Sequence, residues 1–195
     1  MMDTLIHFYK RGTAPFRSLS ALPDVKAIER MQALYMEGAV FWERFKEPAR
    51  YLETRKQVEQ WLRSEFIDKG GQPLAAYPIY MMLGRSKWMQ TMIDSITRAT
   101  TLEIQVPLSD FRENALSFTY PDSMVSFLLN QERNPAYYLP AYHGNVFTLT
   151  EIRTIIAANG LPGYKWGAEL PGHLANYIEA QVWDHEPLMA YGKLN

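Results

Sequence analysis

Residues 102–108 read Leu-Glu-Ile-Gln-Val-Pro-Leu and carry the clearest strand signal in the chain. Apolar side chains alternate there with Glu, Gln and Pro, so one face of the strand is expected to pack on a core while the other is polar or lies at an edge. Further short strands are predicted at residues 5–9, 78–83, 116–120 and 177–183, where apolar or alternating runs end near Gly, Pro or polar residues.

Two segments with helical spacing come before most of these strands. Apolar residues recur every three or four positions from Pro23 to Gly38, and again from Pro48 to the Gly70-Gly71 pair. Shorter segments are expected at 86–96 as a helix, at 123–131 as a helix or turn, and at 148–159 as a helix opened by a capping box. The order predicts an α+β fold, with two early helices packed on a mainly antiparallel sheet of short strands in a single domain spanning residues 1–195.

Composition narrows the class of protein. The chain has 195 residues, 47% of them hydrophobic, which is ample material for one core. Its 20 Lys and Arg nearly balance 21 Asp and Glu, so charge does not indicate a nucleic-acid partner. Cys is absent, the first residues do not form a secretory signal, and no run approaches the ~20 apolar residues of a membrane span. We expect a cytoplasmic protein without a membrane segment.

Several common functional motifs are missing from the sequence. Neither GxGxxG nor GxxxxGK[ST] follows a predicted strand, and neither GxSxG nor HExxH is present. A metal site gathered from His143, His173 and Asp184 remains an alternative, but their spacing does not select one. No metal cofactor is therefore expected.

The predicted strand at residues 177–183 projects Glu179 and Gln181 from one face. Two polar residues on one side of a strand can line a cleft, where a carboxylate could stabilise positive charge developing at a sugar carbon. The alternative is that this face is the solvent side of an antiparallel strand.

Other candidate residues lie near the first strand, the early helix and the 78–83 strand. His7 shares a face with Tyr9 and could bind a ligand, or it could be a structural hydrogen bonder at the edge of a core. Tyr80 and Arg85 flank the end of a strand, where Arg suits a phosphate and an aromatic ring suits a base, although an ordinary turn fits as well. Arg55 belongs to a mixed-charge helix face that could bind a phosphate. The alternative is that this face is simply exposed to solvent.

The order of these segments resembles the ADP-ribosyltransferase fold, and more narrowly the bacterial DNA-targeting ADP-ribosyltransferase toxins. The resemblance is carried by the His-bearing strand at 5–9, the helix around Arg55, the segment from Pro78 to Ser86, and the late strand with Glu179. It implies NAD or a related nucleotide as a substrate, with Glu179 as the catalytic residue and the acceptor unidentified. The residues it assigns to cofactor binding are His7, Tyr9, Arg55, Tyr80, Arg85 and Gln181.

The hypothesis of a non-enzymatic function rests on the aromatic loop at residues 134–145. Tyr and Trp are favoured anchors of protein interfaces because they bury large areas and keep a polar tip. The alternative function is thus an interaction module that docks a protein or peptide through the loop and nearby Trp166. The aromatic residues of the loop are Tyr137, Tyr138, Tyr142 and His143.

Overall fold

The computed structural model describes residues 3–37, 40–96, 100–162, 170–172 and 174–192. Its strands are β1 (Thr4–Lys10), β2 (Ile79–Leu83), β3 (Thr101–Pro107), β4 (Leu116–Thr119) and β5 (Glu179–Val182). Its α-helices are α1 (Asp24–Leu34), α2 (Val40–Glu43), α3 (Pro48–Asp68), α4 (Lys87–Ile96), α5 (Ser123–Glu132) and α6 (Leu149–Asn159).

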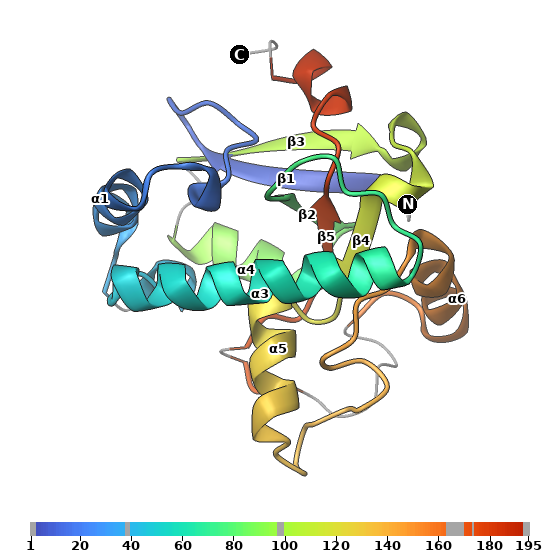
Figure 1. The fold of residues 1–195 in the computed structure, drawn as a ribbon. Coiled ribbons are helices and arrows are strands. Elements are labelled where there is room, and N and C mark those ends of the chain that lie inside the picture. The colour runs from blue at the N-terminus through green and yellow to red at the C-terminus, as the bar shows by residue number, and fades with distance from the viewer. Residues whose placement is uncertain (1–2, 38–39, 97–99, 163–169, 173, 193–195) are drawn as a thin grey trace.

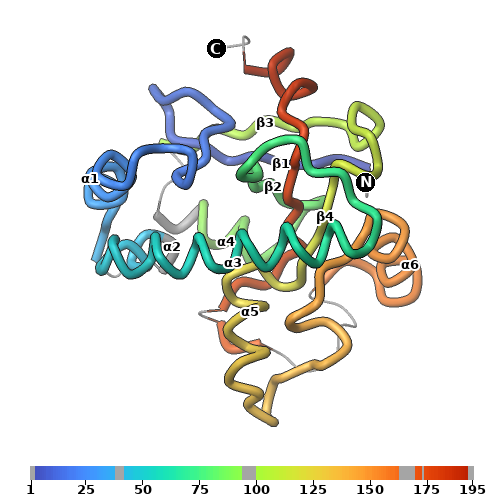
Figure 2. The backbone as a smooth tube through the Cα atoms, in the orientation of Figure 1, coloured from blue at the N-terminus to red at the C-terminus, as the bar shows by residue number. Residues whose placement is uncertain are grey.

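The strands form one antiparallel sheet in the order β3-β1-β2-β5-β4. This confirms the predicted α+β fold and its antiparallel sheet. The last strand in the chain, β5, does not lie at an edge, because it pairs with β2 on one side and β4 on the other. Figure 2 shows the C-terminal segment, in red, passing through the middle of the molecule.

The register of the strands sorts their side chains onto two faces. Pairings across the sheet join Ile6, Met82, Glu179 and Thr119. Residues directly opposite each other point to the same side, so these four define what we call the second face. The first face carries their neighbours Leu5, Met81, Ala180 and Phe118, which are buried in one core cluster together with α6 residues Leu149, Ile152 and Ile156.

Helix α3 runs across the molecule, with α1 near its beginning and α6 near its end (Figure 1). Pro48 stands in its first turn, where a missing N–H has no consequence. Leu52, Leu62 and Phe66 recur at helical spacing and are buried, and the Phe66 ring stacks on Trp183 with centroids 6.4 Å apart. The helix ends before Gly70, whose φ of 85° suits a residue without a side chain.

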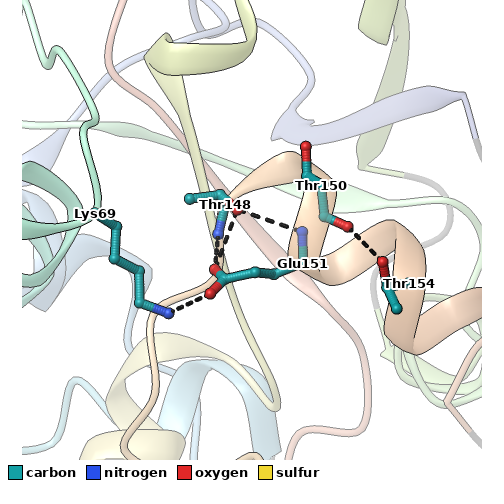
Figure 3. A network of polar contacts seen from close by, with 5 residues as sticks. All are labelled: Lys69, Thr148, Thr150, Glu151 and Thr154. Atoms are coloured by element: carbon teal, nitrogen blue, oxygen red, sulfur yellow. Dashed lines mark hydrogen bonds and ion pairs between the residues drawn. The ribbon is translucent and has the colours of Figure 1, made fainter.

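Helix α6 begins with the predicted capping box (Figure 3). The Glu151 backbone N–H donates to Thr148 Oγ1 at 3.3 Å, and the Thr148 N–H donates to Glu151 Oε2 at 2.7 Å. Lys69, just after α3, donates to Glu151 Oε1 at 2.8 Å. The cap therefore also ties the end of α3 to the start of α6.

Two local results go beyond the sequence-based expectations. Helix α2, residues 40–43, was not expected, because four residues are too few to show a period. Residues 123–132 form a helix, not a turn, and Asp122 caps it by accepting the Val125 N–H at 2.8 Å. In the ranges described above, none of the helices has the length and the apolar run that crossing a bilayer requires.

Candidate functional site

Glu179 is a buried carboxyl group on the second face of the sheet, with 8% of its surface exposed. Its Oε2 accepts hydrogen bonds from the Ser123 backbone N–H at 2.9 Å and from Gln181 Nε2 at 3.2 Å. Burial, and then the negative charge of neighbouring Asp122, raise the pKa of Glu179 from its usual 4.5 to about 7. The carboxyl group can thus hold or release a proton near neutral pH.

Asp122 lies directly before α5 and forms the second half of this carboxyl pair. Burial raises its pKa, while the Val125 N–H bond and the charge of Arg44 act in the opposite direction. Asp122 also lines a pocket, called the first pocket below, whereas Glu179 is not among the described residues of that pocket. Of the two carboxyl groups, Asp122 therefore lies closer to any molecule held there.

This first pocket has a volume of about 470 Å³ and lies between the start of α3, the start of α4 and α5. Three basic residues, Arg44, Lys46 and Arg50, line it together with the aromatic residues Tyr51 and Trp88. Its size falls within the ~300–1,000 Å³ of small-molecule sites. The other described lining residues are Glu47, Thr54, Asp122, Met124, Val125, Leu128 and Ala175. Cations beside aromatic rings suit a ligand with both an anionic and a planar part.

Gln181 is fully buried and joins its own strand β5 to the edge strand β4 through its amide. Its Nε2 donates to Thr119 Oγ1 at 3.1 Å as well as to Glu179, while its Oε1 accepts from Ser117 Oγ at 2.9 Å. Ser117 Oγ in turn accepts the Trp183 indole N–H at 2.9 Å. The amide thus holds the Glu179 side chain in place from within the sheet.

Tyr80 and Arg55 meet between β2 and α3, around the buried carboxylate of Glu59. The Tyr80 hydroxyl donates to Glu59 Oε1 at 3.0 Å, and Arg55 Nε lies 3.1 Å from the same oxygen. The Arg55 guanidinium stacks over the Tyr80 ring at 4.5 Å, and its Nε also donates to Ser20 Oγ at 3.0 Å. Burial is the main cause that raises the pKa of Tyr80 well above its usual value. Both candidate residues are thus engaged in internal contacts.

His7 points to the face of the sheet opposite Glu179. It follows Ile6, which pairs with Met82, and Met82 pairs with Glu179, so His7 and Glu179 lie on different sides. The His7 Nε2 accepts the Phe16 N–H at 3.0 Å, so its Nδ1 carries the proton and donates to the Tyr80 carbonyl at 3.2 Å. Burial lowers the pKa of His7 to about 4, the Tyr80 carbonyl acting weakly against it. These contacts make His7 a neutral link between β1 and the turn at Phe16.

The remaining two candidates lie in different places again. Tyr9 stacks near His7, with ring centroids 6.2 Å apart, and lines a second pocket, separate from the one at Asp122. Arg85 forms a two-pronged, exposed ion pair with Glu103 at 2.8 and 3.3 Å. The structure thus gathers Glu179, Gln181, Tyr80 and Arg55 on the second face and separates His7, Tyr9 and Arg85 from them.

Sequence reasoning missed Arg44, Lys46 and Tyr51 as residues of the pocket, and it gave Asp122 no binding or catalytic role. One local signal was present, because an Asp directly before a predicted helix is a good cap and its carboxylate must lie at the helix start. That signal gives the local role of Asp122 but not its approach to Glu179.

The aromatic loop packs inward. Tyr138 donates its hydroxyl to Asn130 Oδ1 at 2.7 Å, and Tyr142 makes an edge contact with Tyr120, their centroids 6.1 Å apart. His143 is buried and accepts the Leu139 N–H at 3.1 Å. The rings of Tyr138, Tyr142 and His143 are therefore engaged in contacts within the molecule. Trp166 lies outside the described residues.

The described residues do not bring together a metal site from His143, His173 and Asp184. His173 lies outside the described residues, and Asp184 pairs with Arg112 at 3.2 Å. No group of three or more His, Asp or Glu side chains is gathered among the described residues.

Neither a known protein family, nor a curated protein, nor a solved structure matches this chain.

Proposed function

We propose that the protein binds NAD or a related nucleotide in the first pocket and is an ADP-ribosyltransferase-like enzyme. The observation that carries the proposal is the position of Asp122, a buried carboxyl group whose charge raises the pKa of Glu179, at the wall of a pocket rich in basic and aromatic residues. A carboxyl pair whose pKa values are shifted by burial and by a like charge is typical of functional sites.

The binding half of the proposal rests on Arg44, Lys46 and Arg50. Lys46 and Arg50 are exposed at the pocket, and the Arg50 guanidinium has a long, exposed 3.4 Å contact with Glu47. Basic side chains of this kind bind phosphate oxygens, and the rings of Tyr51 and Trp88 offer faces for a planar base. A dinucleotide supplies both groups in one molecule.

The chemical half rests on the carboxyl pair. In NAD cleavage, the bond between the nicotinamide nitrogen and the ribose carbon breaks, and its electron pair leaves with nicotinamide. The positive charge that develops on the ribose is stabilised by a nearby carboxylate. Asp122 takes this role at the pocket wall, and Glu179 behind it adds negative charge once it ionises. An acceptor lone pair then completes the transfer, and the acceptor's proton passes to solvent.

Calorimetry with NAD tests the binding half. The double variant Lys46→Gln/Arg50→Gln should lower the affinity about tenfold or more, because two phosphate-binding charges are lost. Lys26→Gln/Arg30→Gln removes the same charge from exposed positions of α1 and should leave the affinity unchanged. Absence of binding at millimolar NAD, or equal losses in both variants, would overturn this half.

Release of nicotinamide tests the chemical half. Asp122→Asn keeps a good helix cap while removing the charge, so the fold and NAD affinity should persist as turnover drops about a hundredfold. Turnover of the unchanged protein should rise with pH through about 7, as Glu179 ionises. If the Asp122→Asn variant released nicotinamide as fast as the unchanged protein, the proposed chemistry would be wrong.

A further inference from the structure

A second pocket, separate from the first, lies beside the end of β1. Its volume is about 230 Å³. Three regions enclose it: the end of β1 with the start of β3, the end of α1 with the segment after it, and α4. Its described lining residues are Phe8, Tyr9, Lys10, Ala33, Leu34, Tyr35, Met36, Trp42, Met89, Met92, Ile93, Thr100 and Thr101. The proposed function above uses none of them.

Apolar side chains form most of the pocket wall. Met89 belongs to a core cluster on the second face of the sheet, against which Phe8 and Ile93 pack. Leu34 and Trp42 pack against a different cluster, centred on α1 and α3. The pocket therefore lies where two apolar clusters meet without filling the space between them. Packed interiors rarely leave such spaces, and apolar cavities bind apolar molecules.

The charge at the pocket is confined to one place. Lys10 is the last residue of β1 and shares the direction of Phe8, two positions before it. It is the single charged residue among the described lining residues, it is exposed, and no ion pair within the described ranges involves its ammonium. The hydroxyl-bearing residues Thr100 and Thr101 line the same region, and Thr101 is its direct partner across the sheet.

We propose that this second pocket binds a small apolar monocarboxylate, with its hydrocarbon part against Met89, Met92 and Ile93 and its carboxylate at Lys10. The volume is below that of pockets that hold drug-sized ligands, which sets the ligand class at short acids. A single cation beside an apolar wall matches one anionic head on an apolar body. Burial of the hydrocarbon supplies most of the affinity, and Lys10 supplies the preference for an acid.

The methionine methyl groups allow a direct test by NMR, with octanoate as the probe and methyl-labelled protein. Met89 and Met92 line the second pocket, while Met124 lines the first and Met81 is buried in the core. Octanoate should shift the methyl signals of Met89 and Met92 saturably at or below about 1 mM, with the signals of Met124 and Met81 unchanged.

Two variants and a control variant separate the parts of the proposal. Lys10→Gln should weaken octanoate binding about three- to tenfold and leave octanol binding unchanged, because only the acid uses the charge. Lys26→Gln, an exposed lysine on α1, should change neither. Ala33→Trp places a large ring at the pocket wall and should abolish the shifts produced by both ligands.

Each remaining outcome contradicts the proposal. If neither ligand shifts Met89 and Met92 at about 10 mM, the pocket binds no small apolar molecule of this kind. If octanol and octanoate bind equally to the unchanged protein and to Lys10→Gln, the pocket is apolar without a preference for acids. NAD binding, reported by Met124, is measured separately, so failure of either pocket leaves the other result intact.

Discussion

Glu179 Oε2 accepts the backbone N–H of Ser123 at 2.9 Å, so the carboxyl group of an inner strand lies at the first turn of α5. The contact joins residues 56 positions apart in the chain. It brings Glu179 beside Asp122, the residue that caps the same helix. Two carboxyl groups are thereby held together at a helix N-terminus, whose dipole favours negative charge.

The pH dependence of stability should reveal the raised pKa of Glu179. Below about pH 4.5 the group is protonated in both the folded and the unfolded chain. Between about 4.5 and 7 the folded chain retains a proton that the unfolded chain has lost, so the free energy of unfolding falls as pH rises. Across this pH range, we expect the free energy of unfolding of the unchanged protein to fall by on the order of 3 kcal/mol relative to that of Glu179→Gln.

Urea denaturation at a series of pH values measures this difference. Comparison with Glu179→Gln matters because burial lowers the pKa of His7 and of His143 to about 4, and these two groups favour folding as pH rises. Glu132→Gln, at an exposed position of α5, provides the matched control. A pH-independent difference between Glu179→Gln and the unchanged protein would contradict the raised pKa.

The buried pair of Arg55 and Glu59 should show strong energetic coupling. Arg55→Met leaves the Glu59 carboxylate, 2% exposed, without its ion-pair partner and with the Tyr80 hydroxyl as a hydrogen-bond donor, so a loss of about 3–5 kcal/mol is expected. The double variant Arg55→Met/Glu59→Met removes both charges and should lose at least about 1 kcal/mol less than the two single losses added together. Chemical denaturation of all four proteins gives the coupling, and strict additivity would refute it.

Ser117 should matter more than its size suggests. Ser117→Ala removes the acceptor of the Trp183 indole N–H and the donor to Gln181, leaving two buried polar groups unsatisfied. We expect a loss of about 2–4 kcal/mol in thermal or urea unfolding. The exposed Ser109→Ala should change stability by less than about 0.5 kcal/mol, and a similarly small effect at Ser117 would argue against this network.

The cap of α6 gives a local prediction. Thr148→Ala removes the side-chain oxygen that accepts the Glu151 N–H, and about 1 kcal/mol of stability should be lost (Figure 3). Thr154→Ala is the matched control on the same helix, because its hydroxyl donates only to the exposed Thr150 carbonyl. Equal effects of both substitutions in urea unfolding would rule out a specific cap.

Local patterns were sufficient to predict most of the elements. The alternation in residues 102–108 and the capping box at Thr148 are produced by neighbours in sequence, and β3 and α6 appear where these patterns place them. The shared face of Glu179 and Gln181 is equally local, because alternation along a strand fixes it. Local rules determine what each segment forms but not which other segment covers it.

The surroundings of the candidate site depend on long-range pairing. The expected alternatives for the face of Glu179 were a cleft wall or solvent, but β5 is an inner strand, and the Ser123 contact at the start of α5 buries this carboxyl group. His7 and Glu179 lie on opposite faces because of the register between β1, β2 and β5, which their local sequences do not specify. The approach of Asp122 to Glu179 depends on the same pairing.

The inner position of β5 also affects how the chain folds during synthesis. The ribosome makes β2 and β4 before β5, so each of these strands has an unpaired edge until residues 179–182 have been made. Unpaired edges are templates for aggregation. A chain truncated before residue 179 would retain both edges, and we expect cells to remove such fragments by proteolysis or to deposit them as insoluble protein.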